Sequence, residues 1–142
     1  MERLKHVLII VGAIILGAFV NGFILRINGT IIPLPEGVDM KTPEGLQAAM
    51  KVLKPIHFLA PFLAHAIGTL IPAFIIAYFI PLRPKLMAIM TGGVFLVGGI
   101  MMVIQIPGAP MWFNILDLVL AYIPMGLLGY YLAKMLMVKG EK

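Results

Sequence analysis

The side chains of this chain that could do chemistry are few, and each stands within or beside a long apolar stretch. They are Asn21, His57, His65, Thr69, Asn114 and Asp117. Ionisable groups are costly inside a membrane and often functional there. Two imidazoles and a carboxylate can relay a proton, bind a small polar solute or hold a divalent metal ion. All six are therefore candidate ligand- or proton-binding residues, and His57, His65 and Asp117 are a candidate metal set.

The spacing of these residues predicts which helix faces they occupy. His57, Pro61 and His65 recur at four-residue steps and form one stripe, and Asn114 and Asp117 are neighbours at i, i+3. A stripe turned to lipid would leave an imidazole or a carboxylate unsatisfied in hydrocarbon, so both stripes are expected to face inward. We predict that His65 and Asp117 face each other.

Roles without a ligand, namely solvation or structural hydrogen bonding, also stay open for the same residues. Eight positions separate the two histidines, which is wider than a usual metal-binding pair at i, i+4. His57 could simply be solvated at the interface, and His65 could bond a backbone carbonyl or Asp117 in a purely structural contact. Asn21, Thr69 and Asn114 could be plain hydrogen-bond formers between helices.

The elements that must position these side chains are four apolar stretches, at about 7–25, 55–80, 86–106 and 112–136. A membrane-spanning helix needs about 20 mainly apolar residues. The chain is 61% hydrophobic and only 12% charged, whereas a soluble domain carries about 25% charged residues. We therefore predict an all-α integral membrane protein, a four-helix transmembrane bundle in one domain over 1–142. With no cysteine, disulfides and thiolate metal sites are excluded.

The first loop, 26–54, is the only long connection, and it contains a helix signal. Thr42-Pro43-Glu44 offers an N-cap, a proline at the first position and an acid in the first turn. Leu46 and Met50 then fall on one face. The pattern predicts a short amphipathic helix lying on the outer surface, either as a cap over the bundle or as an ordinary connection.

Basic residues predict the orientation of the chain. Arg3, Lys5, Arg83, Lys85 and Lys134 flank the ends that would share one side. Because such residues gather in cytoplasmic segments, both termini are expected to be cytoplasmic. The first stretch is longer than a signal-peptide core and is expected to stay as a helix. The net charge of +5 then reflects topology, and nucleic-acid binding has no support.

Small residues predict close helix packing. Close backbone approach in a bilayer needs such residues, and it serves a tight bundle or self-association equally well. A homo-oligomer and a larger membrane complex both stay open as partners, beside the lipid bilayer itself. The residues concerned are Ala13, Gly17, Gly92, Gly93, Gly98, Gly99, Gly126 and Gly129.

The segments PIHFLAPFLAHAIGTL (55–70) and APMWFNILDLVLAYIPM (109–125), with PEGVD (35–39) in the first loop, resemble those of a group of small four-span bacterial membrane proteins. The resemblance covers most of the chain. It implies a bacterial inner-membrane location and a four-helix fold, and it carries over no catalytic or ligand residue.

Three functions remain open on these observations. The first is binding or translocation of a small solute, metal ion or proton at an outward-facing polar pocket. The second is an accessory or assembly subunit of a larger membrane complex. The third is an intramembrane enzyme acting on a lipid or quinone, although no GxSxG or HExxH motif supports it.

Overall fold

The computed structural model describes residues 1–39, 41–106 and 108–140, and the described part is helical. Its elements, in chain order, are α1 (Glu2–Ile31), α2 (Pro43–Met50), the 3₁₀ turn η1 (Pro55–Phe58), α3 (Leu59–Phe79), α4 (Pro84–Gln105), α5 (Met111–Leu120) and α6 (Ile123–Gly140). By length and composition, four segments could cross a membrane: Glu2–Asn28, Pro55–Phe79, Pro84–Gln105 and Met111–Val138. The expectation of a helical chain with four segments able to cross a membrane is confirmed for the described residues.

The fourth predicted span differs from the expectation of one continuous helix, because it is two helices end to end. Residues Ala121 and Tyr122 form a turn between α5 and α6. Pro124 has no backbone N–H to donate to the Leu120 carbonyl, and proline disfavours helical geometry in the residue before it. The Ala121 N–H closes α5 on the Asp117 carbonyl at 2.9 Å. The break therefore falls one turn after Asp117.

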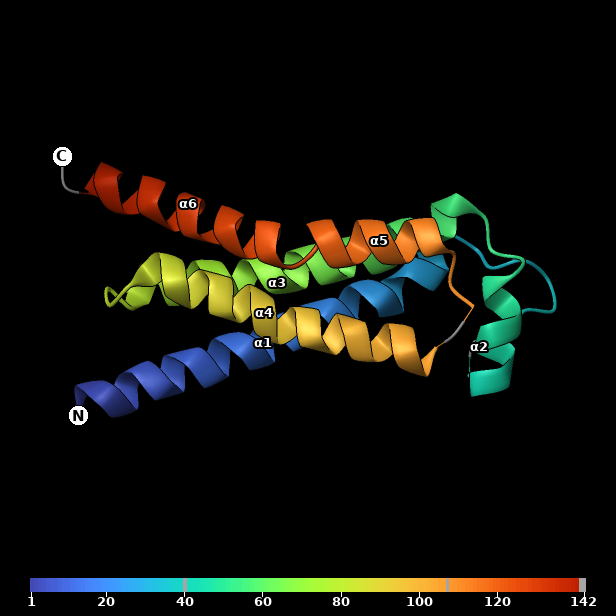
Figure 1. Cartoon of the computed structure of the whole chain (residues 1–142), viewed down its shortest axis with the longest axis horizontal. Helices are drawn as coiled ribbons and strands as arrows, with labels where there is room; N and C mark the ends of the chain where they lie inside the picture. Colours follow the sequence, from blue (N-terminus) through green and yellow to red (C-terminus); the bar gives the residue numbers. More distant parts are fainter. Residues whose placement is uncertain (40, 107, 141–142) are drawn as a thin grey trace.

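Helix α3 is the central element of the bundle, in contact with α1, α4 and α6 (Figure 1). Its sequence suits this position because small side chains occur on several of its faces. Ala64, Ala73 and Ala77 are buried, as is Gly68. A helix surrounded by others can bring three neighbours close only if its own side chains are short.

Helices α1 and α3 cross at two glycines, Gly17 and Gly68. A Cβ atom added to Gly17 would collide with the Gly68 carbonyl oxygen and would lie 2.7 Å from Cγ of Pro72. Pro72 also leaves that carbonyl without its usual helical donor. Ala13, one turn before Gly17, is buried with Ile76 in an apolar cluster. The close packing predicted for Ala13 and Gly17 is thus confirmed.

The glycine pairs of α4 divide between two environments. A Cβ on Gly92 would lie 3.0 Å from the Tyr122 carbonyl oxygen, and a Cβ on Gly99 would strike the Tyr122 ring. By contrast, a Cβ on Gly93 or Gly98 would meet nothing within 4 Å. One glycine of each pair therefore packs against Tyr122 inside the bundle, and the other lies on an open face of α4.

The short helix α2 lies across one end of the bundle, and the start of α1, the turn between α3 and α4 and the end of α6 lie at the other (Figure 1). Thr42 is the N-cap of α2, and its Oγ1 accepts a hydrogen bond from the Gly45 N–H at 3.1 Å. Asp39 accepts from the Lys41 N–H at 2.8 Å. Ala49 is its buried residue. The predicted helix start is confirmed, and α2 covers the end of the bundle nearer the polar residues.

Candidate functional site

His65 of α3 and Asp117 of α5 meet within the bundle. Nδ1 of the imidazole lies 2.9 Å from both carboxylate oxygens, so its N–H can donate to either. The side chain of Asp117 is 5% exposed and that of His65 is 20% exposed. The contact predicted from the two stripes is confirmed. A carboxylate in this setting is tolerated because a donor faces each of its oxygens.

Tyr122 completes the group, although it was not among the sequence candidates. Its hydroxyl donates to Oδ2 of Asp117 at 3.1 Å. Its ring stacks on the His65 imidazole, with centroids 5.7 Å apart and planes 27° apart. On a continuous helix, residues five apart point about 140° away from each other. The turn at Ala121 and Tyr122 removes this separation, and the nearby Pro124 was the one signal that could have revealed it.

Gly99 of α4 makes room for the phenol. A Cβ at this position would lie 2.6 Å from Cζ and 2.8 Å from Cε2 of Tyr122, as well as against the hydroxyl itself. Such distances are closer than real Cβ atoms come. The tyrosine therefore holds its place over Asp117 because the facing residue on α4 has no side chain.

The other ring nitrogen of His65 is free to act. Within the described residues, Nδ1 takes the Asp117 contact and Nε2 makes no hydrogen bond to protein. No buried side-chain nitrogen of the described residues lacks a hydrogen-bond partner, so the unpaired Nε2 has some exposed surface. With Nδ1–H directed at the carboxylate, Nε2 presents a lone pair in neutral histidine and an N–H in the protonated form. The group can thus accept a proton or bond a small polar molecule.

His57 lies apart from this group and is engaged by backbone. Nδ1 accepts from the Lys54 N–H at 3.0 Å, and Nε2 lies 3.3 Å from the Pro33 carbonyl oxygen. The neutral form with its proton on Nε2 satisfies both contacts. His57 is buried, not solvated. Its contacts join the first loop to the start of the second span.

The remaining candidates occupy other positions. Thr69 is fully buried, and its hydroxyl donates to the His65 carbonyl oxygen at 2.8 Å, within its own helix. Asn21 is half-buried at the α1–α3 crossing, where a Cβ on Gly68 would lie 3.0 Å from its Cβ. Asn114 is half-buried one turn before Asp117. The structure therefore brings His65, Asp117 and Tyr122 into contact. Asn21, Thr69 and Asn114 lie outside this group.

The predicted metal set is not brought together. Among the described residues, no group of three or more histidine, aspartate or glutamate side chains lies close enough to hold a metal ion. Both nitrogens of His57 face backbone atoms, and about 12 Å of helix rise separates it from His65. Asp117 has both oxygens occupied by His65 and Tyr122. The geometry favours proton or solute chemistry at His65.

A buried hydroxyl lies in the half of the bundle nearer the termini. Thr91 is buried there, and its hydroxyl donates to the Met87 carbonyl oxygen at 2.9 Å, within α4. This bond uses the hydroxyl proton internally. The Thr91 hydroxyl therefore has no proton left to donate to a ligand at His65.

Comparisons with protein-family models, with curated proteins and with solved structures find no match to this chain. The site is therefore interpreted from its own geometry.

Proposed function

We propose that this chain is a membrane-embedded binding protein that takes up a proton or a small polar solute at Nε2 of His65. The single observation behind the proposal is the arrangement of the imidazole. Nδ1 faces both oxygens of a buried carboxylate at 2.9 Å, while Nε2 has no hydrogen-bond partner among the described residues and is not fully buried. A carboxylate behind an imidazole sets its tautomer and supports its protonated form.

Binding suits this geometry better than passage through the chain. A translocated proton or solute needs polar partners on both sides of the site, and the two buried threonine hydroxyls bond their own helix carbonyls. A ligand at His65 would leave by the side from which it came. Catalysis through a serine or cysteine nucleophile is excluded, because the chain contains neither residue.

The location we propose follows the charge pattern and the resemblance. The chain would lie in a bacterial inner membrane with both termini cytoplasmic, which puts α2 and the His65 site toward the outside. α2 would then cover the outer end of the bundle.

The experiment compares the three histidines with one reagent. Diethylpyrocarbonate acylates accessible imidazole nitrogens, and mass spectrometry reports each site in the purified full chain. His6, whose side chain is 29% exposed, is the positive control. His57, with Nε2 at the Pro33 carbonyl, is the negative control. We expect His65 to react, because its Nε2 is unpaired among the described residues.

Protection then identifies the class of ligand. Methylammonium, acetamide and acetate serve as cationic, neutral and anionic probes, and each is scored by slower acylation of His65 at an unchanged rate for His6. An unreactive His65 beside a reactive His6 would overturn the binding proposal. So would a reactive His65 whose rate is slowed by none of the three probes.

A second candidate is an accessory subunit, and the open face of α4 favours it. Gly93 and Gly98 have unfilled space over their Cβ positions, which a helix of a second copy or of a larger complex could use. Replacing Gly93 by Leu should then reduce the mass of the complex extracted in mild detergent. An unchanged mass would remove this candidate.

A further inference from the structure

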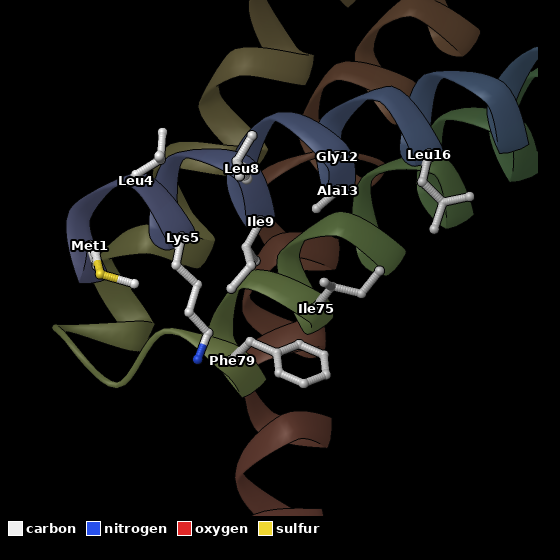
Figure 2. A pocket seen from close by; sticks show the side chains of 10 residues that line it. All are labelled: Met1, Leu4, Lys5, Leu8, Ile9, Gly12, Ala13, Leu16, Ile75 and Phe79. Atoms are coloured by element: carbon white, nitrogen blue, oxygen red, sulfur yellow. The ribbon is translucent and has the colours of Figure 1, made fainter.

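A groove on the surface between α1 and α3 lies at the end of the bundle that holds the termini (Figure 2). Its volume is about 730 Å³, within the roughly 300–1,000 Å³ of small-molecule sites. Its walls are apolar, with Leu8 and Leu16 on α1 and Ile75 and Phe79 on α3. This groove is separate from the His65 group and shares no residue with it.

Lys5 places a cation at one end of this apolar groove. The side chain of Lys5 extends from α1 toward Phe79 of α3 (Figure 2). The nearby acid Glu2 lies 4.0 Å from His6, one turn along the same helix. Within the described residues Lys5 makes no ion pair. Its ammonium group is therefore available to an anion placed at the end of the groove.

The length of the groove matches one leaflet of a membrane. From Lys5 to Leu16 the helix rises about 16 Å at ~1.5 Å per residue. Half of a typical hydrocarbon core is about 15 Å. Lysine near a helix end extends its ammonium to the headgroup level. A molecule with an anion at Lys5 and an apolar chain reaching Leu16 would therefore lie in one leaflet.

We propose that this groove binds an anionic phospholipid, with its phosphate at Lys5 and an acyl chain beside Gly12. Charge selects this occupant over an apolar helix, because a helix would leave the ammonium without a counter-ion. Gly12 belongs to the groove, and a Cβ there would meet no atom within 4 Å. The absence of a side chain at this position keeps the groove open.

The test uses the purified full chain in detergent, titrated with phosphatidylglycerol or phosphatidylcholine, with melting temperature as the readout. Phosphatidylglycerol should stabilise the protein at lower concentration than phosphatidylcholine. Lys5→Gln should weaken the apparent affinity for phosphatidylglycerol about fivefold, as expected for one basic residue at an anionic surface. The response to phosphatidylcholine should stay unchanged.

Two glycine variants separate the acyl chain from the headgroup. Gly12→Leu should fill the groove and abolish the response to phosphatidylglycerol. Gly22→Leu is the matched control, because it lies on the same helix with equally open space but outside the groove. It should respond as the original chain does.

Several results would overturn the proposal. Equal responses to the two lipids, or a phosphatidylglycerol preference that survives Lys5→Gln, would remove the role of the cation. Glycerol 3-phosphate acting as well as the whole lipid would show an anion site without an acyl chain. A change of oligomeric mass in Gly12→Leu, with lipid responses intact, would assign the groove to a second copy. None of these readouts depends on His65, so this proposal and the proposed binding function can fail separately.

Discussion

Removing either member of the His65–Asp117 contact should cost more than removing both. In His65→Leu, the carboxylate of Asp117 keeps the Tyr122 hydroxyl as its one side-chain donor among the described residues. Breaking a buried pair from one side costs about 3–5 kcal/mol. The Tyr122 hydroxyl, which still donates to Oδ2, relieves part of this penalty. We therefore expect a loss of about 2–3 kcal/mol in the free energy of unfolding.

The reverse change should cost less, because the imidazole is more exposed than the carboxylate. In Asp117→Leu, the Nδ1–H of His65 loses its acceptor, which costs about 1–2 kcal/mol for a partly buried donor. The double variant replaces a polar pair with two apolar side chains and should lie within about 1 kcal/mol of the original. The expected coupling free energy, the sum of the two single costs less that of the double variant, is then about 2–5 kcal/mol.

The assay is a double-mutant cycle on unfolding by sodium dodecyl sulfate in mixed micelles, followed by circular dichroism. Asn114→Leu supplies the control, since Asn114 lies one turn from Asp117 on α5 and makes no hydrogen bond to His65. Its coupling to His65→Leu should stay below about 0.5 kcal/mol. If the costs of His65→Leu and Asp117→Leu simply add, the contact carries no stability and the reasoning is refuted.

Two further predictions concern Tyr122 and the first loop. Gly99→Ala should lower the melting temperature and weaken the coupling of His65 to Asp117, because the added methyl group displaces the Tyr122 ring; Gly98→Ala should change neither, and equal effects would contradict the assignment. For the loop, hydrogen bonds from the Lys41 N–H and then from the Thr42 hydroxyl lower the pKa of Asp39. Order at the start of α2 should therefore persist above the ordinary carboxyl pKa and decrease as pH falls below it. Hydrogen exchange of the Gly45 amide should show this, and a pH response that persists in Asp39→Asn would contradict it.

The sequence by itself determined the features that depend on local chemistry. Apolar runs long enough for a bilayer predict spans directly, because backbone groups in lipid must be satisfied within a helix. The start of α2 follows from Thr42 and Pro43, whose capping and backbone preferences act within one turn. The inward direction of His65 and Asp117 also followed from sequence, since a polar stripe facing lipid is too costly.

Tertiary structure decided what depends on two helices at once. The two histidines share a sequence stripe, yet one contacts Asp117 and the other contacts the Pro33 carbonyl. Gly98 and Gly99 are adjacent, yet only Gly99 lies under the Tyr122 ring. The two stripes predicted the contact of His65 with Asp117, but periodicity did not identify Pro33 as the partner of His57 or Tyr122 as the neighbour of Gly99.

Tyr122 shows this division most clearly. Its contact with Asp117 requires a helix break near Pro124, a glycine on α4 and an imidazole from α3 for its ring to stack on. Proline at a helix turn is a local signal, but the direction in which the chain resumes depends on the helices packed against it. The sequence therefore predicted that His65 and Asp117 meet inside the bundle, and the packing of α3, α4 and α5 decided that Tyr122 joins them.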